Sequence, residues 1–197
     1  MKKFLLLLRS ENTEEENNLY IKAITKYGGE VLFVCDTDTK EELLSALTQV
    51  EGVLLPGGYN VGNWDYFLID YAVSHHLKLL GICQGMQSMA LWHSRDSLIP
   101  IGNDLHHQKE GYVHSVMLED SRLKQILGTH SIYVNSYHYQ TVKNSCFFRV
   151  VGKSSDDLIE AVENSNHIFQ IGVEWHPERM IEYDLCSRKL FSYFVSC

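Results

Sequence analysis

The chain has 197 residues, of which 45% are hydrophobic and 21% charged, and its formal net charge is -8. This length suits one domain whose core needs no disulfide or metal, so we expect residues 1–197 to form a single domain. The net negative charge gives no positive electrostatic potential that would hold a polyanion. No segment approaches the roughly 20 apolar residues that span a bilayer. Neither nucleic acid nor a membrane is therefore an expected partner.

Apolar runs of strand length alternate with amphipathic stretches along the first half of the chain. Thr39 followed by Glu42 has the capping-box pattern that opens a helix. Continuous apolar strands separated by helices indicate parallel strands covered on both faces. The predicted strands are at residues 4–8, 31–35, 52–55 and 78–82. They alternate with predicted helices at residues 14–26, from Thr39 onward, at 65–76 and at 86–93.

The second half has a different pattern, with strand-like segments close together and one final helix. These segments predict a partly antiparallel sheet that extends or flanks the parallel one. The expected fold class is therefore α/β, with a mostly parallel central sheet, helices on both faces and additional partly antiparallel strands. The strands are predicted at residues 113–118, 132–134, 147–151, 158–162 and 168–173, and the helix at 182–195.

The cysteine pattern indicates a reducing compartment. The number is odd and no two are spaced as C-x-x-C, so neither a disulfide framework nor a zinc site is expected. The apolar run at residues 4–8 is too short for a signal peptide and ends at Arg9, which favours a buried strand and a cytoplasmic protein. The five cysteines are Cys35, Cys83, Cys146, Cys186 and Cys197.

A candidate nucleophile lies where a buried strand runs straight into a helix. The segment Gly81-Ile82-Cys83-Gln84-Gly85 has the G-x-nucleophile-x-G arrangement. The glycines allow a tight turn, and the following helix directs free N–H groups at the sulfur. We expect these groups to lower the thiol pKa and to hold an oxyanion. A buried structural cysteine is the alternative that five residues alone leave open.

His176 and Glu178 are the candidate base and its orienting carboxylate. Pro177 between them fixes the backbone, so both side chains can project from one loop and the carboxylate can set the imidazole tautomer. We expect Glu174 to point away from the site. A metal is not expected either, because His106, His107 and His114 fit surface histidines without a carboxylate partner at a suitable spacing.

These motifs together resemble the class I glutamine amidotransferase superfamily. The resemblance spans residues 52–178 and is nearest to the γ-glutamyl-γ-aminobutyrate hydrolase branch, of the peptidase C26 type. Asp157 is followed by Leu158 where the family has glycine, and Tyr139 stands where a second histidine is common. The supporting segments are Leu55-Pro56-Gly57-Gly58, Gln87 four residues after Cys83, residues 134–140 as an N-S-x-H-x-Q segment, and residues 157–163 as a D-G-x-I-E-A-I-E strand.

The resemblance implies hydrolysis of a γ-glutamyl amide through a thioester on Cys83, with no metal or organic cofactor. It implies an oxyanion hole at the backbone N–H groups of Gly58 and Gln84. The small γ-glutamyl substrate would be the partner, and the oligomeric state is not specified. The implied substrate-binding residues are Gln87, Asn135, Ser136, Tyr137 and His138.

Three other functions remain open at this point. The chain could be a glutaminase subunit that delivers ammonia to a separate synthase, since it contains no ATP-binding loop of the G-x-x-x-x-G-K-[ST] type. It could be a non-catalytic sensing module of the same fold, although the intact Cys83, His176 and Glu178 argue against this. The DJ-1-like group shares a reactive cysteine in an elbow but lacks a late histidine–proline–glutamate segment.

Overall fold

A nine-stranded sheet forms the centre of the computed structural model, which describes residues 1–102 and 106–197, in the order β2-β1-β3-β4-β13-β12-β11-β7-β8. Five neighbouring strands are parallel: β2 (Glu30–Cys35), β1 (Lys3–Leu8), β3 (Gly52–Leu55), β4 (Lys78–Ile82) and β13 (Gln170–Val173). The others pair antiparallel: β12 (Ile159–Glu163), β11 (Arg149–Ser154), β7 (His114–Leu118) and β8 (Ser131–Val134). The predicted α/β class, with its partly antiparallel extension, is confirmed.

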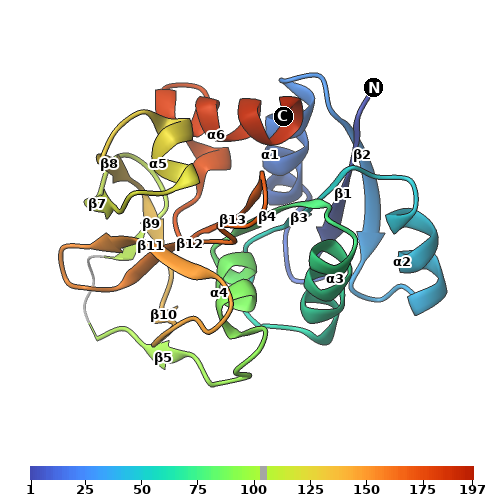
Figure 1. Ribbon diagram of the computed structural model, residues 1–197, viewed down its shortest axis with the longest axis horizontal. Helices are drawn as coiled ribbons and strands as arrows, with labels where there is room; N and C mark the ends of the chain where they lie inside the picture. The colour runs from blue at the N-terminus through green and yellow to red at the C-terminus, as the bar shows by residue number, and fades with distance from the viewer. Residues whose placement is uncertain (103–105) are drawn as a thin grey trace.

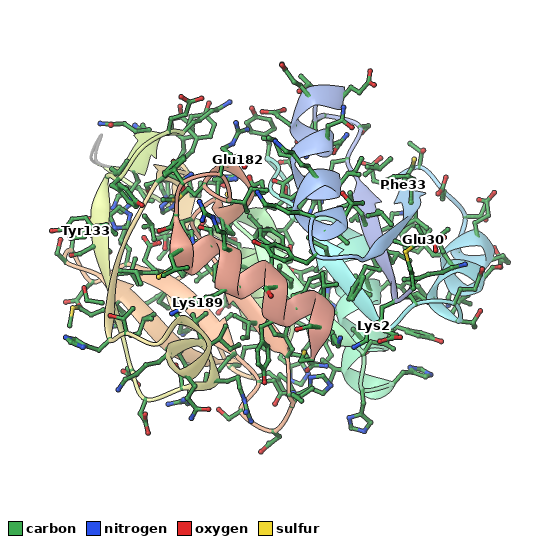
Figure 2. The ribbon with its side chains drawn as sticks, turned by 90° about the horizontal axis from the view of Figure 1, so that it is seen from above. Lys2, Glu30, Phe33, Tyr133, Glu182 and Lys189 are labelled. Carbon is green, nitrogen blue, oxygen red and sulfur yellow. The ribbon has the colours of Figure 1, made fainter. Side chains whose placement is uncertain are left out.

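Helices cover both faces of this sheet (Figure 1). One face packs against α1 (Glu14–Thr25), α5 (Arg122–Leu127) and α6 (Leu185–Ser196), and Figure 2 shows α6 crossing the sheet beside α1. The other face packs against α2 (Lys40–Leu47), α3 (Asn63–Ser74) and α4 (Gln84–Leu91). Helix α5 was not predicted, because six residues are too few to establish a helical period.

The first strand shows why continuous apolar runs were good predictors. Phe4 and Leu6 pack into the core on one face of the sheet, whereas Leu5 and Leu7 pack into the core on the other. All four are fully buried, so the usual alternation of apolar and polar residues is absent. The predicted capping box at Thr39 is present in the structure, with the Thr39 hydroxyl accepting from the Glu42 backbone N–H.

Two pairs of very short strands lie outside the central sheet. β5 (Ile99–Pro100) pairs with β10 (Gln140–Thr141), and β6 (His107–Gln108) pairs with β9 (Ser136–Tyr137). Two residues have no measurable periodicity, so the sequence did not predict them. Through β6 and β9, the segment around residue 107 lies against the segment that begins at Asn135.

The carboxyl ends of the parallel strands bring three predicted segments together. Cys83 follows β4, Pro56 follows β3, and Glu174 follows β13. Because β3, β4 and β13 are parallel neighbours, these residues share one edge of the sheet, where open α/β folds place their ligands. No helix among the described residues is long and apolar enough to cross a bilayer, and all five cysteines are free thiols.

Candidate active site

Cys83 occupies a strained turn between β4 and α4. Its backbone has φ 51° and ψ -110°, a conformation that a residue with a Cβ atom rarely adopts. The two flanking glycines make this turn possible. A Cβ atom on Gly81 would lie 2.7 Å from the Gly85 backbone, and one on Gly85 would collide with the Leu55 carbonyl. The predicted arrangement of strand, tight turn and helix around Cys83 is therefore confirmed.

The Cys83 thiol is buried, and this reverses one expectation. Burial, followed by the negative charge of Glu174, raises the thiol pKa well above its ordinary value, while the Gln84 backbone N–H lowers it by less. The expected lowering of the thiol pKa by the helix N-terminus was wrong, because desolvation raises the pKa by more. The Cys83 sulfur lies 3.9 Å from the Tyr137 carbonyl, to which the thiol donates weakly. A raised pKa favours the protonated thiol over the thiolate.

His176 and Glu178 form a buried hydrogen-bonded pair. His176 Nδ1 lies 2.7 Å from Glu178 Oε1, and η2 (Pro177–Arg179), a 3₁₀ turn, holds the carboxylate in place. Because a carboxylate accepts, Nδ1 carries the proton and Nε2 presents its lone pair. The prediction that both side chains project from one loop and interact is confirmed.

Cys83 and His176 line one cavity of about 90 Å³. The Gly57 backbone lies beside both, since a Cβ atom there would be 2.9 Å from His176 Cε1 and 3.6 Å from Cys83 Cβ. Gly57 must therefore remain without a side chain if Cys83 and His176 are to face the same cavity. The other lining residues are Asn12, Glu16, Tyr20, Gly58, Tyr59, Gln87, Tyr137, His138, Tyr139, Gln140 and Arg179.

A buried ion pair supports the loop of residues 56–58 on the side away from the cavity. Arg9 Nη2 lies 2.5 Å from Asp65 Oδ1, and Arg9 also donates to the Pro56 carbonyl at 3.2 and 3.3 Å. On the cavity side, the Tyr20 hydroxyl accepts from the Gly57 N–H at 3.1 Å. The sequence interpretation used Arg9 only as the end of a strand. The available signal for a role near the site was its position at the carboxyl end of a buried parallel strand, where α/β folds place their ligands.

Asn135 bridges both backbone groups of His176. Its side chain is fully buried, accepts from the His176 backbone N–H at 2.8 Å and donates to the His176 carbonyl at 3.0 Å. Ser136 is also buried, and its hydroxyl lies 2.9 Å from His106 Nδ1. Neither Asn135 nor Ser136 lines the cavity, and their binding of substrate stays a prediction. Their neighbours Tyr137 and His138 line the cavity.

Glu174 lies beneath the nucleophile, whereas the sequence analysis expected it to point away. It is fully buried, and its Oε1 accepts from Gln87 Nε2 at 2.7 Å. The same Gln87 nitrogen donates to the Gln140 carbonyl at 3.1 Å, so the Gln87 amide is held inside the protein although the residue lines the cavity. The expectation failed because β13 is buried on both faces, which removes the alternation that predicts side-chain direction.

Two of the three supposed surface histidines are buried. His106 is 0% exposed and His114 is 4% exposed, and both lie near the buried carboxylate Glu160. Only His107 is partly exposed, as expected. The interpretation failed because Glu160 lies about 50 residues away in the sequence, so no local spacing reveals the contact.

A thiol on a strained turn, with an oriented imidazole in the same cavity, defines a hydrolase or amidotransferase-like enzyme. The Peptidase C26 family profile matches residues 62–178, more than half of the chain, and the chain belongs to this family. The γ-glutamyl-γ-aminobutyrate hydrolase PuuD of Escherichia coli (strain K12) is 28% identical over 230 residues, covering 96% of this chain and 88% of the relative. The predicted superfamily and branch are confirmed.

Two further comparisons agree with this assignment. A putative glutamine amidotransferase of Schizosaccharomyces pombe, PB2B2.05, is 28% identical over 206 residues, covering 90% of this chain and 80% of the relative. The crystal structure of a putative GMP synthase subunit from Thermoplasma acidophilum has a TM-score of 0.74 at 21% identity. It covers 99% of this chain and 92% of that chain, and at this identity it shows the shared fold alone.

Proposed function

We propose that this enzyme hydrolyses a γ-glutamyl amide, either glutamine or a γ-glutamyl amine, through a thioester on Cys83. The observation that carries the proposal is the shared cavity: a nucleophile on a strained turn and an imidazole oriented by Glu178 at 2.7 Å both line it. The similarity to γ-glutamyl-γ-aminobutyrate hydrolases supports the choice of substrate class.

The proposed reaction begins with proton transfer from the Cys83 thiol to His176 Nε2. Because burial raises the thiol pKa, this transfer accompanies attack of the sulfur on the side-chain carbonyl carbon of the glutamyl group. The backbone N–H groups of Gly58 and Gln84 would stabilise the oxyanion. His176 then returns the proton to the leaving amine, which departs as the C–N bond breaks. Water, activated by His176, hydrolyses the thioester and regenerates the thiol.

Charged groups in the cavity suit the glutamyl end of such a substrate. Arg179 and Glu16 both line the cavity, and Arg179 Nη2 lies 3.3 Å from Glu16 Oε1. Arg179 would pair with the substrate α-carboxylate and Glu16 with its α-ammonium group, exchanging their mutual contact for contacts with the ligand. Tyr137 and His138 would wall this end of the site.

The test is turnover of a panel of γ-glutamyl amides by purified protein, measured as release of glutamate and amine. Cys83→Ala should abolish turnover, and rapid acid quenching of the parent should trap a glutamyl adduct on Cys83 that mass spectrometry can locate. Cys146→Ala, which changes an exposed thiol, is the matched control. Equal turnover by Cys83→Ala and the parent would refute the proposal.

Similarity to a putative glutamine amidotransferase supports a second candidate, a glutaminase that delivers ammonia to a separate synthase. The same panel separates the two functions. A free-standing hydrolase should accept γ-glutamyl amines, whereas a glutaminase of this kind should prefer glutamine and gain activity when its synthase is added. Ligand binding without any turnover would instead support a sensing module.

A further inference from the structure

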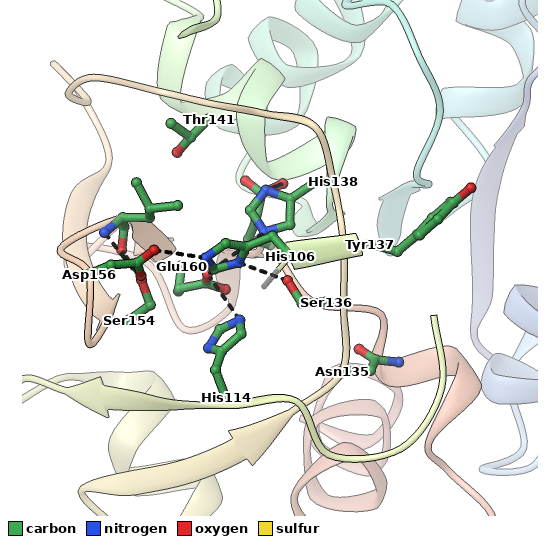
Figure 3. Close-up of polar contacts among 12 residues, drawn as sticks. His106, His114, Asn135, Ser136, Tyr137, His138, Thr141, Ser154, Asp156 and Glu160 are labelled. Atoms are coloured by element: carbon green, nitrogen blue, oxygen red, sulfur yellow. Dashed lines mark hydrogen bonds and ion pairs between the residues drawn. The ribbon is translucent and has the colours of Figure 1, made fainter. Parts of the chain in front are cut away.

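Four buried side chains lie together at the candidate active site. His106, His114 and Glu160 have no role in the proposed reaction, and the fourth, His138, lines the cavity. Figure 3 shows His106, His114 and Glu160 grouped with His138, whose ring lies on the opposite side of His106 from His114. They come from distant parts of the chain: His106 precedes β6, His114 begins β7, His138 follows β9, and Glu160 lies in β12. None is more than 4% exposed.

The spacing of their inner atoms fits one small cation. Glu160 Oε1 lies 3.5 Å from His114 Nε2, 3.8 Å from His106 Nδ1 and 3.8 Å from His138 Nε2. His106 Nδ1 and His138 Nε2 are 3.1 Å apart. Ligand bonds of about 2.0–2.2 Å in tetrahedral geometry place neighbouring ligand atoms about 3.3–3.6 Å apart. The four distances above depart little from this range, and the ligand atoms of His106, His114 and Glu160 all lie within 4.8 Å of one another. Movement of the His114 and His138 side chains toward each other would complete such a site.

Each imidazole is held in the tautomer that a metal requires. The outer nitrogen of each ring faces an oxygen that can only accept a hydrogen bond, so that nitrogen carries the proton and the inner nitrogen presents its lone pair. The three outer contacts are His106 Nε2 to Asp156 Oδ2 at 3.1 Å, His114 Nδ1 to the Ser115 carbonyl at 3.2 Å, and His138 Nδ1 to the Gln140 carbonyl at 3.0 Å.

Three buried atoms of the cluster have no hydrogen-bond donor among the described residues. Among the described residues, neither carboxylate oxygen of Glu160 has a hydrogen-bond partner, and neither does His114 Nε2. The Ser136 hydroxyl donates to His106 Nδ1 at 2.9 Å and would turn away when that nitrogen binds an ion. Buried polar atoms without partners cost about 1–3 kcal/mol each, so a cation that satisfies Glu160 and His114 is favoured.

We propose that His106, His114, His138 and Glu160 bind one Zn²⁺ ion in a closed, four-coordinate structural site. Imidazole and carboxylate ligands suit zinc, and four protein ligands leave no open position for catalysis. Asp156 orients His106 from outside this set. His138 and Ser136 flank Tyr137, whose carbonyl accepts the Cys83 thiol, so the ion would fix the cavity-lining segment of residues 135–140. This proposal does not depend on the substrate of the enzyme.

The test is metal binding by the full-length protein. After chelator treatment and dialysis, Zn²⁺ is titrated against a competing chelator, and the bound metal is counted by mass spectrometry. We expect one Zn²⁺ per chain. Co²⁺ in its place should give the intense visible absorption of a four-coordinate ion. Failure to bind one ion per chain would overturn the proposal in favour of a proton shared among these four groups.

Variants locate the site and need no enzymatic readout. Glu160→Gln and His114→Gln should weaken Zn²⁺ affinity by more than about 100-fold, and Asp156→Asn by about 10–100-fold, as expected for a partner outside the ligand set. His130→Gln, at an exposed histidine, is the control and should bind like the parent. If the ligand variants fail to fold, Zn²⁺ binding by Asp156→Asn and the Co²⁺ spectrum of the parent test whether the site exists. Parent-like affinity in Glu160→Gln or Asp156→Asn would contradict the assignment.

Discussion

The buried pair of Arg9 and Asp65 offers a sharp test of how this fold holds its candidate site. Its two side chains are only 3% and 1% exposed, and Asp65 accepts from two Arg9 nitrogens at 2.5 and 3.1 Å. Asp65 also accepts from the Gly62 N–H at the start of α3. Asp65→Asn keeps the shape of the side chain but leaves the Arg9 charge without a counter-charge in the interior.

Removing one partner of a buried ion pair costs about 3–5 kcal/mol. Since asparagine keeps one acceptor oxygen for Arg9, we expect a loss near the lower end, about 3 kcal/mol. For a chain of this size about 1 kcal/mol corresponds to about 2–4 °C in Tm, which predicts a fall of about 6–12 °C. Because Arg9 also holds the Pro56 carbonyl, kcat/KM should fall together with stability.

The assay is urea unfolding followed by circular dichroism, with Tm as a second measure. A double-mutant cycle of Arg9→Met and Asp65→Leu should show that the double variant loses about 1–3 kcal/mol less than the sum of the singles. Glu182→Gln removes an exposed partner of Lys22 and Lys26 and should leave the unfolding midpoint unchanged. Additive single losses, or an Asp65→Asn variant as stable as the parent, would refute the reasoning.

Three further predictions concern the site directly. Glu178→Gln should lower kcat by about 10²–10⁴-fold with little change in KM, since Glu178 orients His176 and contacts no substrate in the proposed reaction; a KM effect alone would contradict this. Asn135→Ala should lower kcat and stability together, because it removes the hydrogen bonds to both backbone groups of His176. Steady-state kinetics and Tm measure the two effects, and unchanged values would contradict a positioning role for Asn135. Because burial raises the Cys83 pKa above its ordinary value near 9, the thiolate fraction of Cys83 falls steeply as the pH drops below 9. The rate of Cys83 alkylation by iodoacetamide should therefore still rise with pH at pH 9 and be slower at pH 7 than that of exposed Cys146. Mass mapping follows both cysteines, and a plateau for Cys83 below pH 8 would be inconsistent with the raised pKa.

The sequence by itself determined the elements that carry their own local signal. The apolar runs predicted β3 and β4 with the observed bounds, and the capping box predicted the start of α2 at Thr39. The turn around Cys83 was also readable, because glycines on both sides of a nucleophile at a strand-to-helix junction are typical of a nucleophile elbow. His176 and Glu178 were readable because only Pro177 separates them.

Only the tertiary structure decided which distant groups surround those motifs. Glu174, Arg9 and Asn135 each belong to the site through contacts made 41 to 87 residues away in the chain. The pKa of Cys83 depends on burial, which no local motif records, and so its expected direction was wrong. His106 and His114 were expected at the surface but lie in a buried cluster near Glu160, because burial is not visible in local sequence spacing. Strands buried on both faces carry no alternation, so the sequence predicts that they are buried but not where each polar side chain points.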